Sequence, residues 1–209
     1  MLKYLKHNIV PLCLEGILVI CIMAFPEYLL LVNFFFYLGL VTYFIICKDF
    51  SIQEMKENIC AGKKFWIIVF FTAAALVISF AITSVIEMLL PDINNGMGLL
   101  KVHNGFELLI FAMSTIILSP LAEELFYRKS LICFEYKKQI PILIIVSGWL
   151  FALEHSLAPL GILIALIWSI PLMVSYIKTK NVYVVIIAHF ICNFVVNGLD
   201  VISLFNKLN

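Results

Sequence analysis

Ionisable side chains interrupt an apolar stretch of the chain in the segment SPLAEELFYR, which contains Glu123, Glu124 and Arg128. Glu124 and Arg128 are four residues apart, so on a helix they lie on one face as a charge pair. Glu123 lies about 100° round the helix from Glu124 and lacks this partner. Pro120 has no backbone N–H, so it removes the helical bond to Ile116 and opens the helix beside the carboxylates. By itself the segment fits a structural ion-pair cluster as well as a reactive carboxylate.

Two further apolar segments carry polar groups of the kind that enzymes use. One contains Glu154 and His155, and the other contains His189 and Asn193, whose i, i+4 spacing places an imidazole and a carboxamide on one helix face. A charged side chain in a transmembrane helix costs about 2.5–3.5 kcal/mol on insertion scales. This cost is explained most simply if the surplus carboxylate, the histidines and the asparagine meet in one interior site.

Such a cluster predicts hydrolysis of an amide bond. Glu123 and His155 can share a proton and hold a water molecule, which makes that water a nucleophile toward a carbonyl carbon. His189 and Asn193 can donate hydrogen bonds to the oxyanion that the attack forms. Alternatively, Glu123, His155 and His189 form a zinc site whose metal activates the water. The sequence has no HExxH motif and leaves the cofactor open between zinc and none.

The elements that must position these residues are membrane helices. Of the 209 residues, 64% are hydrophobic and 13% are charged, and the mean hydropathy is +1.10. A soluble domain carries about 25% charged residues. A formal net charge of +1, with aromatic residues inside apolar runs, makes nucleic acid an unsuitable partner and leaves membrane lipid and a peptide or protein substrate. The six cysteines have no spacing that suits a structural zinc site.

The sequence predicts an all-α fold, a polytopic bundle of about seven transmembrane helices, because each crossing needs about 20 apolar residues. With the N-terminus inside, all of the 14 basic residues except Lys101 and Lys207 lie at cytoplasmic ends. We therefore predict the N-terminus inside and the C-terminus outside. The predicted spans are residues 8–25, 28–47, 65–90, 105–127, 140–157, 160–177 and 182–200.

The segments between the spans are too short to form domains. Residues 48–64 are polar enough for a surface loop with a short amphipathic turn, and residues 91–104 have the Pro, Gly and Asn of an outside loop. We expect one membrane domain, in which residues 1–104 supply three helices and residues 105–200 supply a catalytic core of four.

Helix lengths predict the relative depth of the polar groups. If the fourth helix continues to Tyr136, Glu123 and His155 both lie about 22–26 Å from the turn that follows it. His189 fits less well, being about 13 Å beyond the loop that precedes it. That loop would have to be recessed, or the last helix tilted.

The three polar segments resemble the signatures of the CPBP family of intramembrane proteases, also called the Abi family, which includes the CAAX prenyl endopeptidases of the Rce1 type. The resemblance covers residues 105–200 and implies that Glu124 and Arg128 are a supporting pair. The signatures EExxxR, FxxxH and HxxxN match, in order, Glu123-Glu124 with Arg128, Phe151 with His155, and His189 with Asn193.

The resemblance also implies a role for each remaining residue. Glu123 would be the catalytic base, His155 would share the water, and His189 and Asn193 would polarise the carbonyl. Glu154 is unexpected between the Phe and the His of the second motif. It either pairs with another group or competes for His155.

The leading interpretation is an enzyme, a CAAX-type intramembrane peptidase that cleaves a membrane-associated peptide such as a lipidated peptide, a leader or a pheromone precursor. With bound zinc it would be a metalloprotease. A bacteriocin-immunity or peptide-binding protein of the same fold is the alternative, although sequestration needs no general base. A transporter with Glu123, Glu124 and His155 as a proton relay is less favoured, because no inverted repeat is evident. The short loops favour a bacterial plasma membrane.

Overall fold

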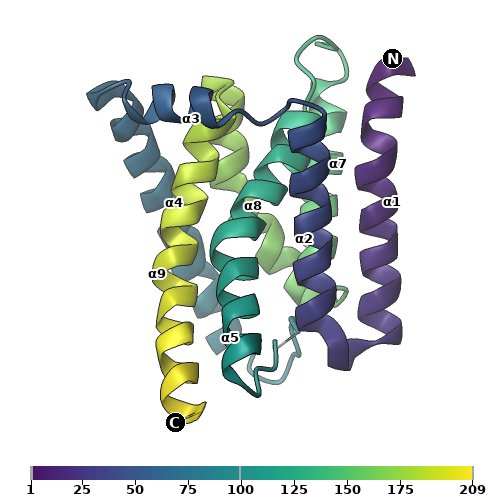
Figure 1. Cartoon of the computed structure of the whole chain (residues 1–209), viewed down its shortest axis with the longest axis vertical. Helices are drawn as coiled ribbons and strands as arrows, with labels where there is room; N and C mark the ends of the chain where they lie inside the picture. The colour runs from purple at the N-terminus through teal and green to yellow at the C-terminus, as the bar shows by residue number, and fades with distance from the viewer. Residues whose placement is uncertain (1, 99, 209) are drawn as a thin grey trace.

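The computed structural model describes residues 2–98 and 100–208, and every regular element in these residues is a helix. Figure 1 shows the long helices side by side along the long axis, with the two termini at opposite ends. We call the end with the N-terminus, α3 and the 131–139 loop the near end, and the end with the 91–104 loop the far end. Termini at opposite ends agree with the predicted odd number of crossings.

The helices follow the predicted spans, which confirms a polytopic helical bundle. Six segments are long and apolar enough to cross a membrane, and α7, with 16 residues, is shorter. At about 1.5 Å per residue α7 measures about 24 Å, less than the ~30 Å hydrocarbon core. Outside the fourth span, the elements are α1 (Leu2–Ala24), η1 (Pro26–Tyr28), α2 (Leu29–Ile46), α3 (Ile52–Ile59), α4 (Lys63–Leu89), α7 (Ile140–His155), α8 (Pro159–Thr179) and α9 (Val182–Leu208).

The fourth span, Gly105–Ser130, is one helix whose register changes along its length. In its two π-helical parts each N–H bonds the carbonyl five residues back, as Ser119 N–H does to Ser114. Such wide turns are rare and frequently occur at functional sites. The parts are α5 (Gly105–Ala112), the π segment η2 (Met113–Leu118), α6 (Ser119–Glu123) and the π segment η3 (Glu124–Ser130).

This central helix ends at Ser130, three residues beyond the predicted span 105–127, so the continuation to Tyr136 on which the depth comparison rested does not occur. Two side chains of α1 donate hydrogen bonds to the carbonyl groups at the end of the central helix. Tyr4 Oη donates to the Leu131 carbonyl at 2.7 Å, and Asn8 Nδ2 donates to the Ser130 carbonyl at 3.4 Å. Terminal carbonyls that a neighbouring helix satisfies need no further turn of their own helix.

The early end of the central helix corrects the predicted depths. Glu123 lies seven residues before Ser130, and His189 lies seven residues after Val182, where α9 begins. The two side chains therefore share a depth without a recessed loop. His155, by contrast, is the last residue of α7 and lies about 22 Å along that helix.

The far-end loop covers the turn between α7 and α8. Ser156 Oγ donates to the Asn95 carbonyl at 2.7 Å. A Cβ at Gly161 would lie 2.0 Å from the same oxygen, so only glycine permits this approach. The loop thus fills the space that the short α7 leaves at its far end.

At the near end, α3 lies across the bundle and confirms the predicted amphipathic turn (Figure 1). Ser51 caps α3 by accepting a bond from the Glu54 N–H at 3.2 Å. Tyr183 Oη of α9 donates to Glu54 Oε2 at 2.8 Å. This polar layer fixes the start of α9, the helix that carries His189.

The central helix is the most buried of the six long segments. It packs between α2 and α9, and its η3 part contacts α7. Outward-facing side chains of the surrounding helices are apolar, as at Ile46, Phe70 and Met88, which suits contact with lipid. The ionisable groups of the central helix are therefore enclosed by the helices that bear the other polar motifs.

Candidate active site

The paired glutamates meet the histidine of α9 at the centre of the bundle. His189 Nδ1 lies 2.9 Å from Glu124 Oε1, and His189 Nε2 lies 3.9 Å from Glu123 Oε2. Arg128 Nε lies 3.3 Å from Glu124 Oε2. Glu123, Glu124 and Arg128 are at most 1% exposed. The local charge pair thus extends across helices to an imidazole that faces both carboxylates.

Phe151 explains how the second motif joins this cluster. The guanidinium carbon of Arg128 lies 4.5 Å from the centroid of the Phe151 ring, a cation–π contact. The His155 ring stacks against Phe151 with a centroid separation of 4.4 Å. Tyr127 meets the Phe151 ring edge-on at 5.6 Å. One aromatic ring therefore connects the buried arginine to the second histidine.

His155 presents a free ring nitrogen. Its Nδ1 lies 2.8 Å from the Phe151 carbonyl oxygen, and because a carbonyl only accepts, Nδ1 carries the hydrogen. Nε2 then has a lone pair available to accept a hydrogen bond. Trp168 packs edge-on against the ring at 5.9 Å and holds its orientation.

A cavity of about 1150 Å³ brings the predicted residues to one space. Glu123, His155, His189 and Asn193 all line it. The cavity extends to the far end, where Lys101 and other exposed residues border it. A peptide could therefore reach the carboxylate from that end of the bundle.

Glu123 presents one oxygen for chemistry. Its Oε1 accepts a short hydrogen bond from Ser119 Oγ, one helical turn earlier. Its Oε2 is buried and has no hydrogen-bond partner among the described residues. Buried polar atoms normally have such a partner, so Oε2 is suited to binding a donor from the cavity.

The wide turn η2 explains the position of Asn193. In this register the N–H of residue 120 would bond the Thr115 carbonyl, but Pro120 has no N–H. Asn193 Nδ2 donates to that carbonyl at 2.9 Å, and Asn197 Nδ2 donates at 3.3 Å. The carbonyl freed by Pro120 is thus that of Thr115, not Ile116 as predicted from an α-helical register. Asn193 keeps a second amide hydrogen for the cavity.

Glu154 does not bond His155; it belongs to a second buried cluster. Tyr127 Oη lies 2.5 Å from Glu154 Oε2 and 2.8 Å from Glu15 Oε2 of α1. A phenol has one hydrogen, so only one carboxylate can accept it, and the other must supply a hydrogen of its own. The three groups therefore hold two hydrogens between them.

The donor set argues against a catalytic zinc ion. Within the described chain, ligand atoms of Glu123, Glu124 and His189 lie within 4.8 Å of one another, and His155 is not in this group. Glu124 Oε1 lies 2.9 Å from His189 Nδ1, and Glu124 Oε2 faces the buried positive charge of Arg128, which opposes a cation at this carboxylate. Glu123 Oε2 and His189 Nε2 remain, one donor fewer than the three protein ligands of a catalytic zinc. The chemistry available at this cluster is that of the carboxylate and the imidazoles.

Sequence reasoning gave no positioning role to the residues that hold the site together. Phe151 was named only as part of the second motif and Ser119 only as the start of the first segment, although their spacing from His155 and Glu123 was a usable signal. Glu15 lies on α1, far from the motifs in sequence, and only its charge inside an apolar run indicated an interior position.

Comparison with known proteins gives a family match that covers the part of the chain that contains the three motifs. Residues 105–195 match the family model described as type II CAAX prenyl endopeptidase Rce1-like. The match confirms the resemblance to the CPBP family, and the matched residues contain the three motifs. The comparison with curated proteins and the comparison with solved structures found no match.

Proposed function

Because residues 105–195 of this multi-pass membrane protein carry an Rce1-like domain, from a protease family, we propose that the chain hydrolyses a peptide bond of a membrane-associated peptide. The substrate class is a lipidated, leader or pheromone-type peptide that enters the cavity. Glu123 acts as general base, His155 shares the water, and His189 with Asn193 stabilises the oxyanion.

One atom, Glu123 Oε2, carries this proposal. It is buried and accepts no hydrogen bond from the described residues, and Glu123 is one of the residues that line the cavity. Ser119 holds the other oxygen of the carboxylate and so fixes the side chain. A base in this setting can take a proton from a water that faces the substrate.

The first step forms the new carbon–oxygen bond. A cavity water donates one hydrogen bond to Glu123 Oε2, and its other hydrogen faces His155 through a second cavity water, because His155 lines the same cavity nearer the far end of the bundle. The proton of the first water passes to Glu123 while its oxygen bonds the peptide carbonyl carbon, and the carbonyl oxygen becomes an oxyanion.

The oxyanion needs donors that are already in place. The second amide hydrogen of Asn193 is one such donor. His189 Nδ1 donates to Glu124, whose charge is paired with Arg128, so Nε2 has a hydrogen to give only in the imidazolium form. In that form Nε2, which lies 3.9 Å from Glu123 Oε2, would give the oxyanion a charge-assisted hydrogen bond.

The second step breaks the peptide bond. Glu123 returns the proton to the amide nitrogen, the carbon–nitrogen bond breaks, and the oxyanion becomes a carboxyl carbonyl. One water is consumed, the products are a carboxylic acid and an amine, and the carboxylate is restored.

The test compares wild type, Glu123→Gln and the control Glu57→Gln, each purified and returned to lipid. Each protein is given a panel of hydrophobic and lipidated peptides, and mass spectrometry identifies the products. Loss of the base should lower the cleavage rate about 10²–10⁴-fold. Glu57 is exposed on α3, so its variant should cleave like wild type.

Two outcomes would count against the proposal. Equal cleavage by wild type and Glu123→Gln would remove Glu123 from the chemistry. Binding of a peptide without cleavage by all three proteins would instead support the peptide-binding alternative, because sequestration uses the cavity without a base.

A further inference from the structure

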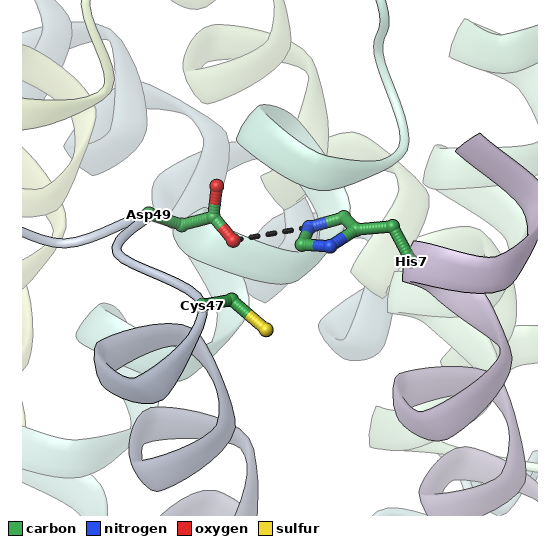
Figure 2. Close-up of side chains that lie close together, drawn as sticks. All are labelled: His7, Cys47 and Asp49. Atoms are coloured by element: carbon green, nitrogen blue, oxygen red, sulfur yellow. Dashed lines mark ion pairs between the residues drawn. The ribbon is translucent and has the colours of Figure 1, made fainter. Parts of the chain in front are cut away.

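A second group of metal-ligating side chains lies at the near end of the bundle, outside the candidate active site. His7 belongs to the first turns of α1, and Cys47 and Asp49 follow the end of α2. Figure 2 shows the three side chains close together, with His7 and Asp49 pointing toward each other, Cys47 beside them, and the ion pair between His7 and Asp49 drawn as a dashed line. The proposed peptidase mechanism uses none of them.

The spacing of the donor atoms suits one ion. His7 Nε2 lies 3.0 Å from Asp49 Oδ2, and these atoms and Cys47 Sγ lie within 4.8 Å of one another. Two donors at about 2.0–2.1 Å from a tetrahedral ion lie roughly 3.3 Å apart. The His7 and Asp49 atoms are thus about as close as two ligands of a shared ion, and the Cys47 sulfur lies within 4.8 Å of both.

The His7–Asp49 contact is close but is not a hydrogen bond. Asp49 Oδ2 is buried and has no hydrogen-bond partner among the described residues, although His7 Nε2 lies 3.0 Å away. An imidazole N–H that served only Asp49 would point at this oxygen. The two atoms are therefore close without being hydrogen-bonded to each other, as two ligands of one ion would be.

The surrounding residues fix all three ligands in place. Tyr43 Oη donates to the His7 carbonyl at 2.5 Å, and the His7 ring packs on Tyr43 at 5.8 Å. Lys48 adopts a positive φ of 62°, a bend that most residues avoid, and it turns the chain between Cys47 and Asp49. A ligand set held by the fold loses little conformational entropy on binding.

The neighbouring cation leaves the carboxylate available. Lys129 Nζ donates to the backbone carbonyl of Asp49, not to its carboxylate. The negative charge of Asp49 is therefore free to offset that of a bound cation.

The donor types select the metal. An imidazole nitrogen, a thiolate sulfur and a carboxylate oxygen together favour zinc-like ions, whereas magnesium and calcium prefer oxygen ligands alone. Cys47 is exposed, so solvent can supply the fourth ligand.

We propose that His7, Cys47 and Asp49 bind one divalent transition-metal ion of the zinc class, which ties the first turns of α1 to the end of α2. The ion has a structural role. It stabilises the near end of α1, the helix that also supplies Glu15 to the buried Tyr127 cluster.

Cobalt provides a direct test, because a cobalt–thiolate bond absorbs in the near ultraviolet and reports sulfur ligation. Co²⁺ is titrated into the purified full-length protein in detergent. Wild type should give a thiolate band that saturates at one ion per chain and that Zn²⁺ removes. The matched control is Cys60→Ser, because Cys60 is also exposed and near the same end but belongs to no ligand group among the described residues.

Three ligand variants and the Cys60→Ser control decide the assignment. Cys47→Ser should lose the thiolate band and Cys60→Ser should keep it. His7→Ala and Asp49→Asn should weaken binding at least about tenfold, since even outer-shell changes cost about 10–100-fold. Because Cys47 is exposed, its serine variant should fold, and thermal unfolding checks this: Zn²⁺ should raise the Tm of wild type and Cys60→Ser but not of Cys47→Ser.

The proposal fails if wild type gives no saturable thiolate band, since His7 and Asp49 would then be an ordinary surface ion pair. It also fails if Cys47→Ser keeps the band. Cobalt bound without a thiolate band and lost in His189→Ala would place the ion at the Glu123–Glu124 cluster instead.

Discussion

At the scale of single residues, Arg128 has the largest energetic consequence, because it places a full charge where no surface is exposed. Its attraction to Glu124 and its stacking on Phe151 offset the cost of leaving water. Removing one member of such a pair costs more than the pair contributes, because the other charge stays buried.

Arg128→Leu should therefore lower the free energy of unfolding by about 3–5 kcal/mol. The double variant with Glu124→Leu should recover part of that loss, because it removes the carboxylate oxygen that faces the lost guanidinium, although it also removes the bond to His189. Denaturant unfolding in micelles measures both, with the exposed Lys178→Leu as control. A double variant less stable than the single one would show that the bond between Glu124 and His189 contributes more than the charge left beside residue 128 costs.

Tyr127 offers a second prediction at this scale, because its hydroxyl lies between two buried carboxyl groups. Tyr127→Phe removes that link and leaves Glu15 and Glu154 facing each other. Stability should fall by about 1–3 kcal/mol or more, the cost of an unsatisfied buried group. Glu154→Gln should cost less, since its amide can still bond the phenol. Thermal unfolding ranks the stabilities of the two variants. If Tyr127→Phe is more stable than Glu154→Gln, the three groups do not share two hydrogens as inferred above.

Spacing along one helix made part of the site predictable. The Glu124–Arg128 pair and the shared face of His189 and Asn193 follow from the helical repeat alone. The Tyr127 cluster joins three helices, and the sequence gives no distance between helices. Its members could be recognised as buried but not as neighbours.

At the scale of elements, the central helix depends on a replacement for one missing hydrogen bond. Pro120 leaves the Thr115 carbonyl unpaired, and Asn193 and Asn197 supply the donors. Asn193 has a structural role, the bond to the Thr115 carbonyl, and a proposed chemical role, the bond to the oxyanion. Restoring a backbone N–H at position 120 replaces the first bond and so separates the two roles.

In the wild-type background, Asn193→Ala should lower the free energy of unfolding by about 1–3 kcal/mol. It should also lower the rate of peptide cleavage. With Pro120→Ala the restored N–H can bond the Thr115 carbonyl, so the same change should cost less stability. Cleavage should stay low in both backgrounds if Asn193 is an oxyanion donor. Recovery of cleavage along with stability would assign Asn193 a structural role alone.

The element boundaries show where prediction from sequence stopped. The seven apolar segments were recognisable from composition, and their order and approximate bounds were confirmed. The end of the central helix was misplaced because Tyr4 and Asn8, from the other end of the chain, satisfy its last carbonyls. A tertiary contact of this kind leaves no trace in the local pattern.

At the scale of the whole molecule, the cavity and the basic residues lie toward opposite ends. The cavity extends to the 91–104 loop, whereas most lysines gather at the near end with α3 and the 131–139 loop. Under the predicted topology, a peptide would enter from the outer side of the membrane.

Cysteine labelling in sealed vesicles tests this orientation. In a variant without the other cysteines, native Cys60 should react with a membrane-impermeant thiol reagent only from the cytoplasmic side. A cysteine introduced as Lys101→Cys should react only from the outer side. If both cysteines react from the same side, the two ends of the bundle do not lie on opposite sides of the membrane. If Cys60 reacts only from outside and the cysteine at position 101 only from the cytoplasm, the topology and the entry route are reversed.

The contacts of α1 indicate that the part of the chain that matches the family does not fold independently of the N-terminal helix. Residues 105–195, which match a family, carry the three motifs, yet α1 supplies Tyr4 and Asn8 to the end of the central helix and Glu15 to Tyr127. The segment that matches the family is therefore smaller than the segment whose contacts hold the central helix. Expressed alone from residue 105, the domain would keep its reactive groups but leave the end of the central helix and the Tyr127 hydroxyl without the partners that α1 supplies.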